Sequence, residues 1–311
     1  MTLDPDAARL LEMARKAGKP PYETVDAETA RQLYREGRRA LQPEPLAVAE
    51  TRDLSAPRPG GTVPLRLYRP DGATAGESLP VLIYFHGGGW VLGDIDSHDG
   101  VCRHLAARSG CAVVSVDYRM GPEHKFPAAV DDAVAATRWV AANAAELDID
   151  PARLAVAGDS AGGNLAAVVS LHERDAGGVA VGAQMLFYPA TDFAMDTESH
   201  RLFGEGHLLT HAAMRWFQAQ YLAPGDEADW RASPLRADDL AGLPTAYVIT
   251  AGFDPLRDEG EAYARRLVEA GVPVTTRRYT GQIHGFLTMG RIIAQSAEAL
   301  DAAAKWLRTN L

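Results

Sequence analysis

A serine between two glycines stands in the segment 158–162 (GDSAG), which we call the serine turn. Apolar residues precede it at 154–157 (LAVA), and helix-forming residues follow it at 164–167 (NLAA). In a sharp turn between a strand and a helix, the serine hydroxyl stands clear of the sheet and the helix N-terminus favours negative charge beside it. Glycines are needed there because larger flanking side chains would clash with backbone. The pattern predicts that Ser160 is a nucleophile, although Gly-x-Ser-x-Gly alone also occurs by chance.

A second motif is the segment 86–90 (HGGGW), which we call the glycine loop. Three glycines leave backbone N–H groups open to a substrate oxygen, and such donors stabilise the oxyanion of acyl transfer. We predict that the N–H groups of Gly88, Gly89 and Ala161 form this oxyanion hole. The alternative, a phosphate loop, lacks both the Walker spacing and Gly-x-Gly-x-x-Gly. His86 is expected to anchor the loop by hydrogen bonds rather than to act as a base.

A serine hydroxyl needs a general base, usually an imidazole. His284 is the candidate because it lies in the glycine-flanked loop 281–286 after an expected strand, and such loops carry reacting groups. Asp254 follows another expected strand and would orient that imidazole. The competing acids Asp258 and Glu259 are expected to begin the next helix, where they complement its dipole.

The other histidines are weaker candidates for the base. Three lie on expected helices and are assigned to the surface or core: His98, His104 and His172. Three lie in the segment 190–225 and are assigned to the surface rather than to substrate contact: His200, His207 and His211. The last, His124, lies in a loop and has no evident partner.

The elements that position these residues follow from the apolar pattern. Continuous apolar runs indicate central parallel strands covered on both faces, whereas the alternating run 63–68 suits an antiparallel strand. Strands that alternate with helices over more than 200 residues predict a doubly wound, mostly parallel α/β sheet. The expected strands are 63–68, 81–85, 112–116, 154–157, 185–188, 246–251 and 274–279. The expected helices are 98–108, 127–146, 161–173, 257–270 and 291–308.

Two segments stand outside this alternation. Residues 1–45 read as two helices separated by the prolines 20–21, too short to bury much against each other. Residues 190–225 are too long for a simple connection and rich in apolar residues, as lids often are. We therefore predict a helical cap segment at 1–45 and a catalytic domain at 46–311 with a cap insertion at 190–225.

The composition narrows the class of protein. The chain has 311 residues, 47% apolar and 23% charged, which excludes a disordered, collagen-like or low-complexity chain. A net charge of −10 argues against nucleic acid and stable membrane association as partners. Cys102 and Cys111 are expected as reduced core thiols, and two thiols cannot complete a zinc site unaided. The charged N-terminus is neither a secretory signal nor a spanning helix, so we expect a cytoplasmic protein.

These motifs resemble the bacterial hormone-sensitive-lipase-like carboxylesterases (family IV) of the α/β-hydrolase fold. The matching segments are 86–90 with Gly93 and Asp94, 117–127 (DYRMGPEHKFP), 158–163 (GDSAGG), 254–258 (DPLRD) and 284–286 (HGF). The resemblance covers about 45–311 well and the N-terminal helices loosely. It implies an eight-stranded sheet with a cap made of the N-terminal helices and the insertion, and cofactor-free hydrolysis of short- to medium-chain acyl esters. Met120 and Gly121 depart from the usual Leu-Ala, and the charges of 117–127 are expected to tie loops together.

The predicted reaction is two-step acyl transfer to Ser160, with His284 as base and Asp254 as its partner. The predicted substrate contacts are Trp90, Phe203, Leu209, Met214 and Phe286, and half of the apolar insertion residues are expected to pack the lid instead. The partner is a small-molecule ester, and the chain is a monomer or homodimer. Three alternatives stay open: a serine peptidase or amidase, a binding module such as the plant hormone receptors, and an acyltransferase.

Overall fold

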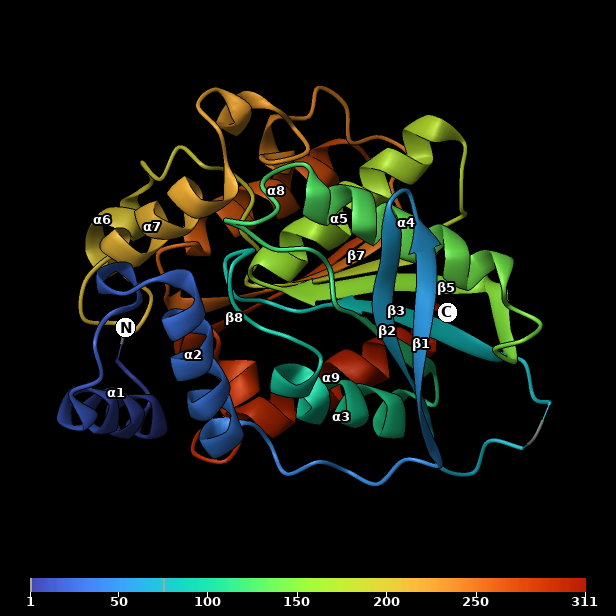
Figure 1. Ribbon diagram of the computed structural model, residues 1–311, viewed down its shortest axis with the longest axis horizontal. Helices are drawn as coiled ribbons and strands as arrows, with labels where there is room; N and C mark the ends of the chain where they lie inside the picture. The colour runs from blue at the N-terminus through green and yellow to red at the C-terminus, as the bar shows by residue number, and fades with distance from the viewer. Residues whose placement is uncertain (1, 75) are drawn as a thin grey trace.

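An eight-stranded sheet forms the centre of the computed structural model, which describes residues 2–74 and 76–311. Its strands lie in the order β1-β2-β4-β3-β5-β6-β7-β8 (Figure 1). β2 is antiparallel to both of its neighbours, and every other neighbouring pair is parallel. The mostly parallel sheet confirms the predicted fold class. The strands are β1 Glu50–Arg58, β2 Gly61–Arg69, β3 Leu79–Phe85, β4 Ala112–Val116, β5 Ile149–Asp159, β6 Ala183–Phe187, β7 Thr245–Phe253 and β8 Val274–Ile283.

The edge strands carry the weakest sequence signal. β1 is the strand that the apolar pattern does not predict, and of its residues only Ala56 is buried. β8, at the opposite edge, is mainly exposed over its first half. An edge strand needs few apolar residues because one side of it faces water, so it lacks the continuous run of a central strand.

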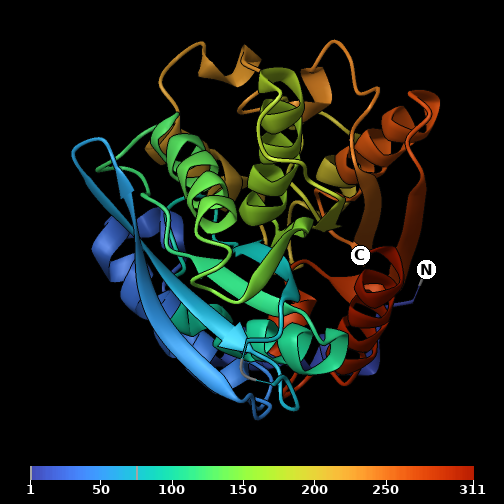
Figure 2. The same ribbon diagram turned by 90° about the vertical axis from the view of Figure 1, so that its right-hand side faces the viewer.

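The central strands are buried on both faces, as their apolar runs predict. In β3, Val81, Ile83 and Phe85 join one hydrophobic core, while Leu82 and Tyr84 join the other. Figure 2 shows α4, α5 and α8 over one face of the sheet and α3 and α9 over the other. These helices are α3 Asp99–Ser109, α4 Ala128–Ala142, α5 Ala161–Ala176, α8 Arg257–Glu269 and α9 Gln295–Asn310, with short 3₁₀ turns at η2 Asp96–His98, η3 Asp226–Ala228, η4 Pro234–Arg236 and η5 Phe286–Met289.

The N-terminal segment forms α1 Pro5–Ala17, the turn η1 Tyr22–Thr24 and α2 Ala27–Leu41. The Asp4 carboxylate accepts a hydrogen bond from Asp6 N at 2.8 Å and begins α1, which ends at the left-handed Gly18 (φ 58°). Asp26 caps α2 in the same way through Thr29 N at 2.9 Å. Local capping therefore explains the two helices and the break between them.

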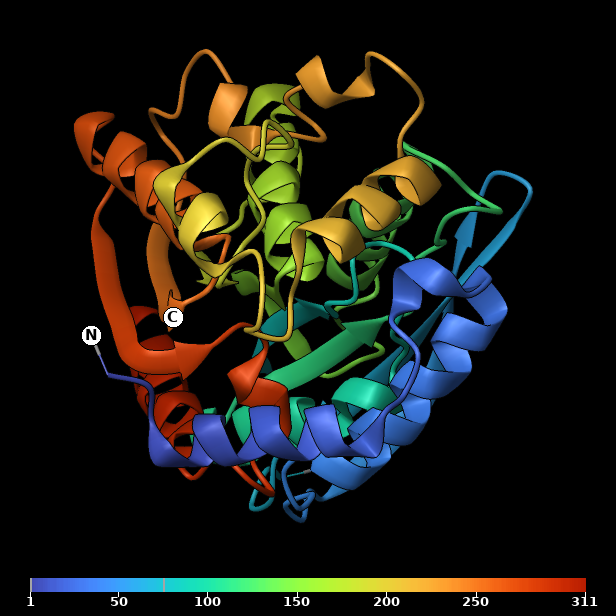
Figure 3. The same ribbon diagram turned by 90° about the vertical axis from the view of Figure 1, so that its left-hand side faces the viewer.

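The segment 190–225 contains α6 Glu198–Phe203 and α7 His211–Tyr221, which lie on the same side of the molecule as α2 (Figures 1 and 3). Tyr34 of α2 and Phe217 of α7 share a small apolar cluster with Leu92, just beyond the glycine loop. Both segments therefore pack over the glycine loop. Among the helices of the described chain, none combines the length and hydropathy needed to cross a bilayer.

Candidate active site

The serine turn adopts the strained geometry that its residue types allow. β5 ends at Asp159 and α5 begins at Ala161, with Ser160 between them at φ 55° and ψ −117°. A Cβ atom on Gly158 would lie 2.2 Å from Gly162 O, and one on Gly162 would lie 1.8 Å from a backbone oxygen of β3. Both flanking glycines are therefore required, and the tight turn holds the Ser160 hydroxyl above the sheet.

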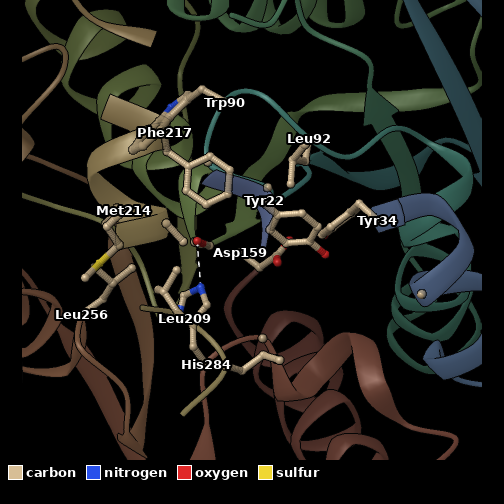
Figure 4. A pocket seen from close by; sticks show the side chains of 18 of the residues that line it. Tyr22, Tyr34, Trp90, Leu92, Asp159, Leu209, Met214, Phe217, Leu256 and His284 are labelled. Carbon is tan, nitrogen blue, oxygen red and sulfur yellow. Dashed lines mark hydrogen bonds between the residues drawn. The ribbon is translucent and has the colours of Figure 1, made fainter. Parts of the chain in front are cut away.

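Three residues that are distant in the sequence come together: Ser160, His284 and Asp254. His284 is 124 positions from Ser160 and 30 positions from Asp254. His284 Nε2 lies 2.9 Å from Ser160 Oγ, and a dashed line from His284 in Figure 4 marks this hydrogen bond. His284 Nδ1 lies 2.8 Å from Asp254 Oδ2. Asp254 follows β7 and His284 follows β8, so the ends of neighbouring parallel strands supply both side chains. Asp254 is fully buried, and its Oδ1 accepts a hydrogen bond from Leu256 N at 2.8 Å. With a proton on Nδ1, Nε2 is free to accept the serine proton.

Asp159 holds the serine turn from beneath. Its Oδ1 accepts hydrogen bonds from Tyr84 Oη at 2.8 Å and Gly87 N at 2.9 Å, and lies 3.3 Å from His98 Nε2. Burial acts to raise the pKa of this carboxyl. The charge and hydrogen bond of His98, together with the hydrogen bond from Tyr84, outweigh burial and lower the pKa to about 2. Asp159 is thus a buried carboxylate that the motif analysis did not single out.

The glycine loop is fixed by His86, as predicted. The His86 ring is fully buried, its Nδ1 lies 2.9 Å from Gly87 O, and it stacks on Tyr118 with 4.4 Å between ring centres. Burial lowers the pKa of His86 to about 4, so the ring is neutral at pH 7. Gly88 and Gly89 have φ values of 125° and 63°, a conformation that favours glycine.

Three backbone amides near Ser160 are free to bind a ligand. Within residues 2–74 and 76–311, the N–H groups of Gly88, Gly89 and Ala161 donate to no protein group. A Cβ on Gly88 would lie 2.1 Å from Leu92 O, so the close turn behind this amide requires glycine. These are the donors that the sequence assigns to the oxyanion hole.

A cavity of about 200 Å³ opens beside Ser160 and His284. Of the predicted substrate contacts, Trp90, Leu209 and Met214 line it. Phe203 and Phe286 do not. Phe203 packs on Phe253 with 5.4 Å between ring centres, because α6 turns it toward the end of β7. Phe286 is fully buried between Tyr188 and Tyr279, because the left-handed Gly285 turns the chain into η5 and points this ring into the core.

The cavity also contains residues that the sequence analysis missed. The N-terminal segment contributes two tyrosines, an arginine and a leucine, and the rest of the chain contributes mainly apolar side chains together with Glu259. These residues are Tyr22, Tyr34, Arg38 and Leu41 from the first segment, and Phe217, Leu256 and Glu259 from the rest. Phe193 and Leu208 also line the cavity, and both are among the apolar insertion residues that the sequence assigns to an acyl pocket. Tyr34 and Arg38 are four residues apart on α2, and the spacing of two side chains on one helix face was the one available signal.

The competing acids bind the insertion to α8. Asp258 Oδ2 accepts a hydrogen bond from Ser199 N at 2.7 Å, and Glu259 Oε1 accepts one from Thr191 N at 2.7 Å. Both lie in the first turn of α8, as predicted, and burial raises the pKa of Glu259 well above its ordinary value. The surface assignment was wrong for His200, which is fully buried with its Nε2 3.3 Å from Glu259 Oε2.

The charged segment 117–127 ties loops together, as predicted. Arg119 forms an ion pair with Asp132 at 2.8 Å, Glu123 forms one with Arg31 of α2 at 2.6 Å, and Lys125 Nζ donates to the end of α7 at 2.7 Å. In the described part of the chain, no group of three or more His, Cys, Asp or Glu side chains has the arrangement of a metal site.

Known proteins of the same fold match this chain over most of its length. The family model described as the α/β-hydrolase fold matches residues 82–288. Carboxylic ester hydrolase LipN of Mycobacterium tuberculosis is 43% identical over an alignment that covers 100% of this chain and 84% of that protein. Ethyl acetate hydrolase of Pseudomonas putida is 40% identical, with 100% of both chains covered. The solved structure of ester-hydrolase Eh1AB1 from the metagenome of Lake Arreo has a TM-score of 0.96 and 45% identity, with 99% of each chain covered.

The chain therefore belongs to the α/β-hydrolase family, in its hormone-sensitive-lipase-like carboxylesterase branch. This confirms the resemblance drawn from the motifs. As a member of that branch, it is a serine ester hydrolase.

Proposed function

We propose that this protein hydrolyses short- to medium-chain acyl esters through Ser160, His284 and Asp254, by way of an acyl-enzyme. The observation that carries the proposal is the continuous chain of contacts from Ser160 Oγ to His284 at 2.9 Å and from His284 to Asp254 at 2.8 Å. A nucleophile, a base and an orienting carboxylate in this order are what acyl transfer requires.

In the first step, Ser160 Oγ attacks the ester carbonyl carbon while its proton passes to His284 Nε2. Buried Asp254 stabilises the imidazolium, and the N–H groups of Gly88, Gly89 and Ala161 bind the oxyanion. The imidazolium then gives its proton to the leaving alcohol oxygen, which leaves the acyl group on Ser160. In the second step water attacks this ester, His284 accepts the proton of the water, and the carboxylic acid departs as the proton returns to Ser160.

The cavity supports a limit on acyl length. One end is lined by Leu209 and Met214 of the insertion and by Leu256 at the start of α8, and each buried methylene contributes about 0.8 kcal/mol of binding. In a cavity of about 200 Å³ this gain ends once the acyl chain reaches the far wall. We therefore expect activity to peak near butyrate to hexanoate and to fall sharply for longer chains.

The test is a series of p-nitrophenyl esters from acetate to palmitate, with the Ser160→Ala variant alongside. Ser160→Ala is expected to lower turnover about a millionfold, and Ser78→Ala, at an exposed serine, is the matched control. Retention of more than a few per cent of activity in Ser160→Ala would overturn the nucleophile. A maximum on long-chain triglyceride emulsions would overturn the chain-length assignment.

We also propose that the segments 1–45 and 190–225 act together as the cap of this site. Tyr34 and Phe217, one from each segment, support this assignment because they share a cluster above the glycine loop and line the cavity. The expected result of deleting residues 1–45 is loss of substrate affinity beyond any loss of stability. Unchanged KM in a folded truncated chain would contradict it.

A further inference from the structure

Arg38 is a cationic side chain in the cavity that has no acidic partner. It lies in the last turn of α2 and lines the same cavity as Ser160 and His284. Its guanidinium donates to Thr288 Oγ1, and its Cζ lies 4.6 Å from the centre of the Tyr34 ring. Across residues 2–74 and 76–311, no Asp or Glu oxygen lies within 4.0 Å of this guanidinium.

The other arginines of α2 are placed differently. Arg31 pairs with Glu123 at 2.6 Å, and Arg35 pairs with Glu28 at 3.4 Å. Arg39 is exposed to water. A partly buried cation without a direct ion-pair partner is costly, and a guanidinium has five N–H donors in a fork that fits a carboxylate. Arg38 uses one donor on Thr288, so others remain to bind a ligand in the cavity.

Two tyrosines lie beside Arg38 and make this end of the cavity polar. Tyr22 and Tyr34 both line it, with 6.4 Å between their ring centres. Burial raises the pKa of Tyr34 to about 12, so its hydroxyl remains a hydrogen-bond donor at neutral pH. Figure 4 shows both rings on the side of the cavity opposite Met214 and Leu256. The two ends of the cavity therefore differ in chemistry: one carries Arg38 and two tyrosines, and the other is lined mainly by apolar side chains.

We propose that the α2 end of the cavity binds a carboxylate carried by the ester substrate, and that Arg38 determines this specificity. The inference rests on the proposed esterase function, because it requires the ester bond at Ser160. An ester has two halves on either side of the reacting carbon, so one half occupies the apolar end and the other extends toward Arg38. The carboxylate comes either from the acyl half, as in half-esters of dicarboxylic acids, or from the alcohol half, as in acyl esters of hydroxy acids.

A structural role for Arg38 makes a different prediction. Arg38 joins α2 to η5 through Thr288, and its charge helps to lower the pKa of Asp159. If this were its whole role, substitution would reduce the hydrolysis of neutral and carboxylate-bearing esters by the same factor. The ratio of the two rates therefore separates substrate recognition from support of the fold.

The experiment measures kcat/KM by proton release for matched pairs of substrates. One series compares monoethyl esters of dicarboxylic acids from succinate to suberate with ethyl alkanoates of equal length. The other compares butyryl esters of short hydroxy acids with butyryl esters of the corresponding alkanols. The proteins are the full chain, Arg38→Met, Arg38→Lys and, as the charge-matched control, Arg39→Met.

The full chain should prefer the carboxylate-bearing member of at least one pair. Arg38→Met should lower the carboxylate-to-neutral ratio of kcat/KM for that pair by about 10- to 100-fold, the range expected for a charge-assisted hydrogen bond. Arg38→Lys should restore part of this ratio, and Arg39→Met should leave it unchanged. If Arg38→Met does not fold, the full chain alone gives the answer, because added salt should lower only the rate on the charged ester.

Two results would overturn the inference. One is an unchanged ratio in Arg38→Met, and the other is a full chain that hydrolyses every carboxylate-bearing ester more slowly than its neutral partner. Both leave the esterase function intact, because the neutral esters are still hydrolysed. Failure to hydrolyse esters of either kind would instead refute the proposed function, and the inference with it.

Discussion

The carboxylate of Asp159 accepts a hydrogen bond from the backbone N–H of Gly87 at 2.9 Å, although the two residues are 72 positions apart. Asp159 directly precedes Ser160, and Gly87 directly precedes Gly88. One hydrogen bond thus joins the serine turn to the glycine loop. The distance between the attacking oxygen and the amides assigned to the oxyanion hole depends on this contact.

Replacement of Asp159 by Asn is expected to reduce both stability and activity. Asn is similar in size but lacks the negative charge of Asp159, whose Oδ1 lies 3.3 Å from His98 Nε2. The lowered pKa of Asp159, about 2 against an ordinary 3.8, corresponds to about 2 kcal/mol of stability. We expect this loss at pH 7 in urea unfolding, together with a fall in kcat of about tenfold or more as the amides shift. Asp71→Asn, at an exposed position, is the control.

The pH dependence of that loss is a separate prediction. Because the folded pKa lies below the unfolded one, the charge of Asp159 stabilises the protein fully above about pH 4 and ceases to do so as the pH falls through about 2. The difference in unfolding free energy between the native chain and Asp159→Asn should therefore be constant from pH 7 to pH 5 and narrow between pH 4 and pH 2. A difference that widens toward acid pH would contradict the assigned charge.

Substitution by alanine should change stability in opposite directions at two helical glycines. A Cβ on Gly162 would lie 1.8 Å from Phe85 O, so Gly162→Ala must displace β3 or the serine turn. We expect a large loss of stability and nearly complete loss of activity. Gly37 in α2 has no atom within 4 Å of its Cβ position, so Gly37→Ala should stabilise the chain by about 0.5–1 kcal/mol through helix propensity. Thermal unfolding compares the two, and equal effects would contradict the account.

The acyl-length optimum should depend on the apolar end of the cavity. Met214 lines it and is only 5% exposed, so Met214→Ala should enlarge the cavity and move the optimum toward longer esters. A stability loss of about 2–5 kcal/mol accompanies such a truncation. Leu202→Ala is the matched control, because Leu202 lies in the same insertion but is 56% exposed. An optimum that moves equally in both variants would exclude Met214 from the acyl site.

Much of this architecture could be predicted from the sequence because the signal is local. Ser160, Asp254 and His284 each follow a buried strand, and parallel strands bring such residues to one edge of the sheet. Phe286 was misassigned because a single left-handed residue, Gly285, decides which way its ring points. The motif HGF identifies the residues and not this rotation.

The polar end of the cavity could not be predicted in the same way. In the sequence, Tyr34 falls at helical spacing with Ala30 and Leu41, as a residue packed on the body would, and Arg38 is one charge among several on that helix. Their place in the cavity depends on how α2 docks, which contacts such as Arg31 Nε to Val91 O at 2.9 Å determine. Such tertiary contacts join residues 60 positions apart and leave no periodic pattern in the sequence.

The most direct test of the central claim is to trap the acyl group on the protein. The chain is mixed with p-nitrophenyl butyrate, quenched in acid within the first turnovers, digested and analysed by mass spectrometry. We predict a butyryl group on the peptide that carries Ser160. In His284→Ala, this acylated peptide should accumulate only at a greatly reduced rate. A butyryl group on any other residue would contradict the account. A burst of nitrophenol followed by steady turnover, with no acylated peptide, would also contradict it.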